Sequence, residues 1–244
     1  SSQEISTARC ASAKVTTTAT VKVMTINLRN ESDQWERRFP LIADEIERLD
    51  PDIIGLQEVQ ISQDQANVLN DLLQKRGHAK YHLFTHRKSG WRGWFRGEGI
   101  GIMSRWPIVK EDHEDTGEMR VSVHARIKHP SGAFLDMADT HLDHHGGAEG
   151  DADRDDEARQ TVDLITRNDD CRPTFLTGDM NATESSSAVK RFLSAGFVDS
   201  YKQVHGAAET AARGNTAMIK LADGAFEQHP SRRIDFVLGQ SAGP

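Results

Sequence analysis

The sequence lacks any apolar stretch approaching the roughly 18 residues that a membrane-spanning helix needs, so we expect no membrane span. Its hydrophobic content of 36% and charged content of 27% are typical of a soluble globular protein. Cysteine is scarce, because only Cys10 and Cys171 occur, far apart and without a metal-binding spacing. They fit either one disulfide or two free thiols, so the sequence leaves a secreted and a cytoplasmic location equally open.

Positive charge is not in excess either, since 37 acidic residues outnumber 30 lysines and arginines for a net charge of −7. This balance argues against bulk nucleic acid as the main partner, although a local basic patch could still bind phosphate. Residues 1–20 lack the basic start and apolar run of a signal peptide. We interpret them as a leader, either disordered or the start of a mature secreted protein. Residues 21–244 are expected to form one domain.

Apolar periodicity predicts strands and helices that alternate along the chain, as in an α/β protein. The predicted strands are 21–28, 53–59, 81–85, 99–103, 120–127, 134–141, 174–177 and 234–238. The predicted helices are about 40–49, 65–76, 158–167 and 185–195. Residues 130–132 read as a hairpin turn, and residues 205–230 show no clear period and are predicted to be a loop.

Polar side chains stand where several of these strands end. The apolar run 174–177 enters Gly178-Asp179-Met180-Asn181, which projects a carboxylate and a carboxamide beyond the carboxyl end of a buried strand. Open α/β sheets place their chemistry there. The pair is suited to orienting water against a phosphoryl group, but Asp, Asn and Gly are also ordinary turn residues. Asn27 likewise is either a turn residue or a neutral ligand at the end of its strand.

Two carboxylates lie inside apolar strands, where stripping their water costs several kcal/mol unless a partner compensates. Glu58 stands in the nearly continuous apolar run 53–59, and Asp235 in the run 234–238. For Glu58 the sequence favours a hard metal ion as partner over a structural ion pair. Asp235 poses the same problem near the end of the chain.

A dense polar cluster ends the predicted strand 134–141, formed by Asp139, His141, Asp143, His144 and His145. Asp-x-His-x-Asp-His is similar to the zinc-binding run of metallo-β-lactamase-like hydrolases with its first histidine replaced. Alternatively, His141 alone faces the crevice as a donor to phosphate while its neighbours serve the loop. A hydrophilic turn without a function is the third interpretation.

Two further segments stand out by composition. Residues 146–157 are rich in glycine and then in acid, and we interpret them as a solvated insertion. Their aspartate spacing imitates a calcium loop, but Asp156 replaces the required glycine and Val162 the bidentate glutamate. Residues 86–97 carry four fixed cations, three aromatics and no acid. They are predicted to form a loop that grips an anionic substrate, associates with a membrane surface, or packs its aromatics back onto the body.

Six short segments, read in order, resemble the endonuclease/exonuclease/phosphatase superfamily of deoxyribonuclease-like hydrolases. They are 24–29 (MTINLR), 56–59 (LQEV), 102–108 (IMSRWPI), 140–144 (THLDH), 178–181 (GDMN) and 233–236 (RIDF). The resemblance covers residues 21–238, nearly the whole chain. A lactamase-like enzyme would predict none of the other segments, so the resemblance disfavours that interpretation of the histidine cluster.

The resemblance implies an α/β four-layer sandwich, with two mixed β-sheets face to face, helices outside and the active site at one end. It implies that Glu58, helped by Asn27, holds Mg²⁺ or Mn²⁺. Asp179 and Asn181 would position the attacking water, and Asn181 and His141 would also contact the phosphoryl group. Arg120 would add to that clamp, although a surface salt bridge is an equal alternative.

One departure from the family pattern concerns the end of the chain. The family carries a Ser-Asp-His some tens of residues after the Arg-Ile-Asp strand, and its histidine is the general base that Asp235 would orient. This sequence ends at Pro244 without that motif, so the final strand of the second sheet is also expected to be missing. We favour a C-terminally incomplete domain over a degenerate family member.

The leading hypothesis is a Mg²⁺-dependent phosphodiesterase or phosphatase that acts on a small or lipid-like phosphoester. A nuclease acting on DNA or RNA is one alternative, since residues 86–97 provide positive charge locally. A catalytically impaired binding protein on the same fold is the other. Nothing in the sequence indicates the oligomeric state.

Overall fold

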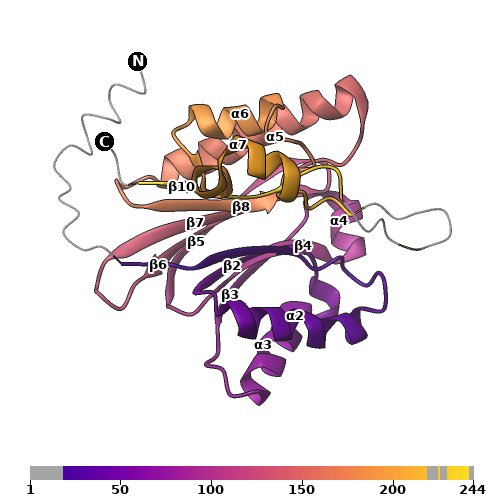
Figure 1. Cartoon of the computed structure of the whole chain (residues 1–244). Coiled ribbons are helices and arrows are strands. Elements are labelled where there is room, and N and C mark those ends of the chain that lie inside the picture. Colours follow the sequence, from indigo (N-terminus) through magenta and orange to yellow (C-terminus); the bar gives the residue numbers. More distant parts are fainter. Residues whose placement is uncertain (1–18, 219–224, 226–229, 242–244) are drawn as a thin grey trace.

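The structure is a computed structural model that describes residues 19–218, 225 and 230–241, without the side chains of residues 92–94 and 210–212. Two β-sheets lie face to face, and helices cover the outer face of each (Figure 1). The four-layer sandwich of two mixed sheets expected from the sequence is thereby confirmed. Apart from residues 19 and 20, the proposed leader lies outside the described residues.

The first sheet comes from the N-terminal part of the chain. Across the sheet its strands are β1 (Val23–Asn27), β2 (Ile53–Gln60), β4 (Glu98–Ser104) and β3 (His82–Arg87). β1 runs parallel to β2, and β4 pairs antiparallel with both of its neighbours. Its helical elements are α2 (Trp35–Leu49), the short 3-10 turn η1 (Ile61–Gln63), α3 (Gln65–Lys75) and α4 (Gly90–Arg96). α2 and α3 cover its outer face (Figure 1).

The second sheet comes from the rest of the chain. Across the sheet its strands are β5 (Ile108–Gly117), β6 (Arg120–Lys128), β7 (Phe134–His141), β8 (Thr174–Asp179), β10 (Asp235–Gln240) and β9 (Val198–Asp199). Its helices are α5 (Gly147–Asn168), α6 (Ser187–Ser194) and α7 (Ser200–Arg213). β7 and β8 are parallel, so His141 and Asp179 end their strands side by side. β10 is antiparallel to β8, which places Asp235 opposite Asp179.

Three groups of buried apolar side chains hold the layers together. One lies between the first sheet and α2 with α3, one between the two sheets, and one between the second sheet and α5 with α6. Phe39, Ile100 and Phe192 are central members of the three groups and are almost fully buried. Each such side chain stabilises the fold by roughly 1.5–3 kcal/mol. In the described part of the chain, no helix has the length and apolar character to cross a membrane.

The two sheets approach one another closely at Gly55 on β2. A Cβ atom added there would lie 2.0 Å from Thr177 Oγ1 and 2.4 Å from Asp139 Oδ1. Asp139 accepts hydrogen bonds of 2.7 Å from both Thr177 Oγ1 and Gln57 Nε2, and the Gln57 amide comes from the opposite sheet. A polar contact therefore joins the sheets inside an otherwise apolar interior.

The solvated insertion predicted for residues 146–157 is wrong, because α5 begins at Gly147 and continues unbroken to Asn168. Its buried face follows the helical period but uses small and polar residues: Gly150, Arg154, Glu157, Ala158, Thr161, Leu164, Ile165 and Asn168. The predicted helix began only where apolar residues appear, at Ala158. An apolar stripe is the usual sign of a packed helix, and the first half of α5 lacks one.

Four other elements also differ from the prediction. β5 was not expected, because its run of charged residues lacks strand propensity. It is an edge strand, where charged side chains prevent pairing with strands of other molecules. α2 begins at Trp35, five residues before the predicted start, and Pro40 lies inside it. Residues 90–96 are helical rather than a loop, and α7 extends to Arg213 with a break at Gly206. Glycines inside both segments obscured their helical pattern.

Candidate active site

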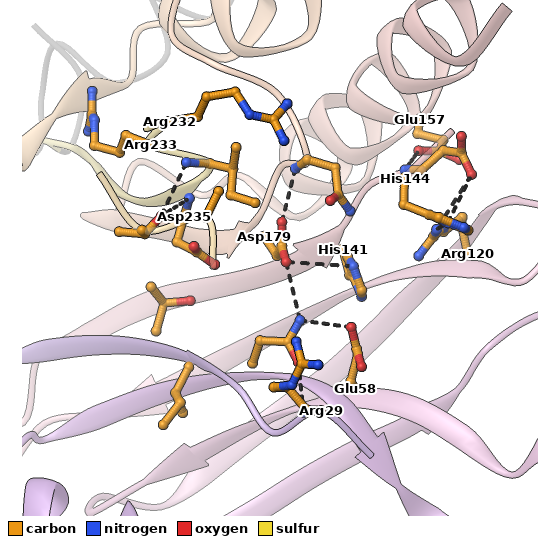
Figure 2. Close-up of a pocket in the computed structure, with 18 of the residues that line it drawn as sticks. Arg29, Glu58, Arg120, His141, His144, Glu157, Asp179, Arg232, Arg233 and Asp235 are labelled. Carbon is orange, nitrogen blue, oxygen red and sulfur yellow. Dashed lines mark hydrogen bonds and ion pairs between the residues drawn. The ribbon is translucent and has the colours of Figure 1, made fainter. Parts of the chain in front are cut away.

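A cleft of about 1680 Å³ opens at one end of the sandwich. All seven residues predicted from the sequence line it: Asn27, Glu58, Arg120, His141, Asp179, Asn181 and Asp235. They come from both sheets and converge on the same space (Figure 2). The strand ends explain this convergence, because β1, β7 and β8 finish there and β10 starts there.

Asn27 joins the two sheets at the floor of the cleft. Its amide nitrogen donates to Glu58 Oε1 over 2.9 Å and to Asp179 Oδ2 over 3.2 Å. Its Oδ1 accepts the backbone N–H of Arg29 over 2.8 Å, which fixes the orientation of the amide. Glu58 sits at an irregularity in β2 with a φ of 49°, so its side chain leaves the regular alternation of the strand. This departure explains why an apolar strand presents a carboxylate to the cleft.

A second carboxylate, Glu98, lies beside Glu58 and was not identified from the sequence. Asn30 donates to Glu58 Oε2 over 3.1 Å and to Glu98 Oε2 over 3.4 Å. The Lys88 ammonium forms a buried ion pair with Glu98, and burial lowers the pKa of Lys88. In the sequence, Glu98 simply precedes an apolar run, as many surface residues do. Only its neighbours in the folded structure identify it as part of the site.

Asp179 and Asn181 are held by the turn that follows β8. Asp179 Oδ1 accepts the backbone N–H of Asn181 over 3.0 Å, and the Asn181 amide donates to the Leu142 carbonyl over 2.9 Å. Asn181 has a φ of 47°, a left-handed conformation that asparagine tolerates better than most residues. Burial, and then the nearby charge of Glu58, raise the pKa of Asp179.

Asp235 faces Asp179 across the β8–β10 pair. Burial and the charge of Asp179 raise the pKa of Asp235 to about 7. Its backbone N–H donates to Thr216 Oγ1 over 3.1 Å. Two carboxylates at paired strand positions cannot both ionise without cost, so the charge of Asp179 favours the protonated form of Asp235.

His141 is buried beside Asp179, and its Nε2 lies 3.8 Å from Asp179 Oδ2. Burial, followed by the charges of Arg120 and Lys88, holds the pKa of His141 well below its ordinary value. Among the described residues, its Nδ1 has no hydrogen-bond partner. Nδ1 is itself buried, so the ring nitrogen beside the Asp179 carboxylate is Nε2.

Arg120 is buried, and the salt bridge considered for it is present as an ion pair with Asp143, although not at the surface. Its Nη2 lies 3.4 Å from Asp143 Oδ1 and donates to His144 Nδ1 over 2.9 Å (Figure 2). Because His144 accepts through Nδ1, it is neutral there, and burial lowers its pKa. The Arg120 guanidinium lines the cleft, where its positive charge also acts on the carboxyl groups of Glu157 and Asp179.

Glu157 and Arg154 of α5 hold the loop that follows His141, and the sequence gave no sign of either role. Glu157 Oε2 accepts the N–H of Asp143 over 2.7 Å, and Arg154 donates to the Asp143 carbonyl over 2.9 Å. Both side chains are buried, although the segment was expected to be solvated. Burial raises the pKa of Glu157 to about 7.

The polar cluster 139–145 does not act as one ligand set. The Asp139 carboxylate is fully buried between the sheets, bonded to Gln57 and Thr177, and burial raises its pKa well above the ordinary value. His141 instead faces the cleft. Asp143 and His145 bond to one another through a 2.8 Å contact to His145 Nδ1. The lactamase-like zinc run is therefore not formed.

The donor chemistry at the cleft floor fits a hard divalent cation. Glu58, Glu98 and Asp179 supply carboxylate oxygens, and Asn27 and Asn30 supply carboxamides. Mg²⁺ and Mn²⁺ prefer such oxygen ligands. The charge of Glu58 raises the pKa of Asp179, so negative charge has accumulated there. A cation would compensate it.

The basic and aromatic segment 86–97 borders the cleft through Lys88 and Arg96. On α4, the side chains of Trp91 and Phe95 are 70% and 73% exposed, with ring centroids 5.9 Å apart. Most of the surface of both aromatic side chains is therefore exposed to solvent.

Several solved structures share this fold. A Bacteroides thetaiotaomicron mannosyl-6-phosphatase aligns with a TM-score of 0.69 and 22% identity, over 91% of this chain and 85% of that one. The human Nocturnin catalytic domain with bound sulfate gives 0.66 and 21%, over 90% and 82%. D. rerio TDP2 complexed with a single-strand DNA product gives 0.67 and 19%, over 91% and 84%. At these identities the likeness shows the fold alone.

A search of curated proteins finds no match. A family model does match, over residues 24–242, and it is described as the endonuclease/exonuclease/phosphatase family. The matched range contains both sheets and every residue of the cleft floor. The chain therefore belongs to the endonuclease/exonuclease/phosphatase family.

Proposed function

We propose that the cleft hydrolyses phosphoester bonds with the help of Mg²⁺ or Mn²⁺. One observation carries the proposal: a set of carboxylates and a set of buried hydrogen-bond donors lie in the same cleft. Asn27 links Glu58 and Asp179 over 2.9 and 3.2 Å, while buried Arg120 and His141 line the adjacent wall. A phosphoryl group needs both, a cation-binding side and direct hydrogen-bond donors.

Glu58 and Asn27 would hold the metal ion, with Glu98 close enough to act through Asn30. When bound, the ion would polarise a phosphoryl oxygen and stabilise the leaving group. Glu58 would bind through its oxygens, and Asn27 would keep Glu58 and Asp179 in a fixed relation. Asn30 would orient the carboxylates from the other side.

Asp179 and Asn181 would orient the attacking water. The Asp179 carboxylate is itself oriented by the Asn27 amide and the Asn181 N–H, so its direction is set before substrate arrives. It can accept a hydrogen bond from the water, and the Asn181 amide oxygen can accept a second hydrogen bond from the same water. Asp235, opposite Asp179 in the sheet, would hold a proton close to this water.

His141 and Arg120 would bind the non-bridging phosphoryl oxygens. His141 lines the cleft with its Nε2 close to Asp179, and Arg120 is kept in place by His144 and Asp143. Both are buried, so their hydrogen bonds to a developing negative charge would be stronger than in water. They would stabilise the transition state rather than transfer the first proton.

A small or lipid-like phosphoester is the substrate class that we favour. The cations Lys88 and Arg120 lie buried at the inner end of the cleft, where one phosphoryl group would fit. The outer lining includes Val204 and Met218, which are 77% and 51% exposed and would suit an apolar remainder. Exposed Trp91 on α4 would give a lipid-like substrate further contact.

A nucleic acid is the second candidate, because five arginines besides Arg120 line the cleft: Arg29, Arg96, Arg213, Arg232 and Arg233. Carboxylates such as Asp153 and Asp156 share the lining and would repel a long polyanion. The dependence of substrate affinity on salt distinguishes the two, since contact with several phosphates gives a steep slope. We expect a shallow slope.

The test is hydrolysis of bis(p-nitrophenyl) phosphate by wild type and Asp179→Asn, with Mg²⁺ and with EDTA. Asp163→Asn on the exposed face of α5 is the matched control. We expect Mg²⁺-dependent turnover that falls at least 100-fold in Asp179→Asn and stays unchanged in the control. Mg²⁺ binding measured by calorimetry without any turnover would instead favour a binding protein on the same fold.

A further inference from the structure

A group of three metal-ligating side chains lies outside the cleft, where the free edges of the two sheets meet. His86 belongs to β3, the edge strand of the first sheet, and His113 and Asp115 belong to β5, the edge strand of the second. One ligand atom from each lies within 4.8 Å of the others. All three are half-buried or exposed, so an ion could reach them from solvent.

Strand alternation explains why these side chains converge. Asp112 and Glu114 of β5 bind Arg167 of α5, on the outer face of the second sheet. His113 and Asp115 alternate with them and therefore point to the inner face. Their partners in the neighbouring strand, Val123 and Val121, belong to the apolar group between the sheets.

On the first sheet, His86 also points to the inner face, toward His113 and Asp115. Phe84 of β3 belongs to the apolar group between the sheets, and His86, two residues further, shares its face. The rings of His86 and His113 stack with centroids 3.7 Å apart and an angle of 22°. The three side chains thus close the open edge of the sandwich, where apolar packing ends.

Hydrogen bonding prepares His86 for a metal. Its Nδ1 lies 2.9 Å from the Arg87 carbonyl oxygen. A carbonyl can only accept, so Nδ1 carries the proton and the lone pair stays on Nε2. This arrangement, with one ring nitrogen donating to a carbonyl and the other free, is how proteins orient histidine ligands. Within the described residues, the Asp115 carboxylate has no hydrogen bond or ion pair that would compete.

We infer that His86, His113 and Asp115 form a binding site for a borderline transition metal ion of the Zn²⁺ class, separate from the phosphoester cleft and independent of its chemistry. Two imidazoles and one carboxylate are a donor set that suits Zn²⁺ and disfavours Mg²⁺. Ligand atoms of a tetrahedral site lie about 3.4 Å apart when the bonds are about 2.1 Å. Because the two rings are stacked, His113 would have to turn out of the stack so that both imidazole lone pairs point at the ion.

The neighbouring group Asp143, His144 and His145 has the same composition but a different environment. The Asp143 carboxylate already accepts the backbone N–H and Nδ1–H of His145, each over 2.8 Å. The Arg120 guanidinium lies 3.4 Å away and would repel a cation. This group therefore serves as a matched comparison rather than as a second site.

A metal at the edge would connect the two sheets close to the cleft. Lys88 follows His86 by two residues, and Thr116 and Gly117 follow Asp115 directly; all three line the cleft. Ser89 also bonds to the Arg120 carbonyl over 2.9 Å, which ties the β3 side to the start of β6. Binding of the ion would thus stabilise the sandwich and restrain one wall of the cleft.

The experiment is a titration of the whole chain with Co²⁺, a spectroscopic substitute for Zn²⁺, in saturating Mg²⁺. Absorption in the visible range reports nitrogen ligation, and a competition with Zn²⁺ gives its affinity. The variants are His113→Ala and Asp115→Asn. His82→Ala, an exposed histidine on the same strand as His86, and His145→Ala are the controls.

We expect one Co²⁺ per chain, displaced by Zn²⁺, with affinity reduced at least tenfold in His113→Ala and Asp115→Asn and unchanged in both controls. Zn²⁺ should also raise the melting temperature of wild type more than that of His113→Ala. Absence of a Co²⁺ spectrum in wild type would overturn the proposal. So would a spectrum that survives His113→Ala, or one that His145→Ala abolishes. Circular dichroism checks that each variant is folded.

Discussion

Replacing Glu157 by glutamine changes one charge at a buried position in the wall of the cleft. The side chain is only 4% exposed, and its Oε2 accepts the N–H of Asp143 over 2.7 Å. Glutamine has nearly the same shape and keeps a carbonyl oxygen for that hydrogen bond. The substitution therefore removes the cost of burying the negative charge while it preserves the contact that positions the loop.

The size of the effect follows from the pKa of Glu157, which burial raises from 4.5 to about 7. A carboxyl group with a raised pKa costs no stability below pH 4.5, costs progressively more between pH 4.5 and 7, and has its full cost above pH 7. The difference between the two pKa values corresponds to about 3 kcal/mol at most. Glu157→Gln should therefore be more stable than wild type at pH 8 by about 1–3 kcal/mol.

The assay is urea denaturation of wild type and Glu157→Gln at pH 5 and pH 8. The stability gain should be present at pH 8 and small at pH 5. Glu149→Gln, an exposed position on the same helix, should show little change at either pH. Glu157→Ala removes the acceptor and should destabilise at both. A Glu157→Gln gain that is equal at the two pH values, or a loss at pH 8, would refute the reasoning.

Substitutions at three further positions test other parts of the account. Gly55→Ala would force a Cβ to 2.0 Å from Thr177 Oγ1 and 2.4 Å from Asp139 Oδ1, and should destabilise the fold by about 3 kcal/mol in urea denaturation. Asn181→Gly should lower phosphoester turnover about 100-fold with little loss of stability, whereas Asn181→Ala should lose about 1 kcal/mol more because its φ is 47°. Arg120→Lys should raise KM about tenfold and leave Mg²⁺ affinity unchanged, because lysine cannot reproduce the guanidinium fork.

The main features of the site could be predicted because they depend on strand ends. Polar residues that follow an apolar strand are visible in the sequence, as at Asn27, His141 and Asp179. The topology then brings those ends together, since β7 and β8 are parallel and β10 is antiparallel to β8. Glu58 was visible for a different reason, as a charge inside an apolar run.

Other residues of the site could not be found in this way. Glu157 and Arg154 lie on a helix whose buried face is polar and small, so no apolar period marks them. Glu98 and Asn30 belong to the site only because they lie beside Glu58 in space, and Glu58 is far from both in the sequence. The proximity of β3 and β5 at the edge of the sandwich depends on how the two sheets stack, and no local sequence pattern encodes that stacking. Cys10 lies outside the described residues, and Cys171 is not a free thiol.

The most direct test of the central claim is the Mg²⁺ dependence of phosphoester hydrolysis in wild type and Glu58→Gln. Glu58 is held by Asn27 and Asn30, and glutamine keeps its size while removing the charge that would bind the ion. The account predicts turnover that EDTA abolishes, and a Glu58→Gln variant that needs at least tenfold more Mg²⁺ and turns over more slowly. Turnover that persists in EDTA, or a Glu58→Gln variant with the Mg²⁺ dependence of wild type, would contradict it.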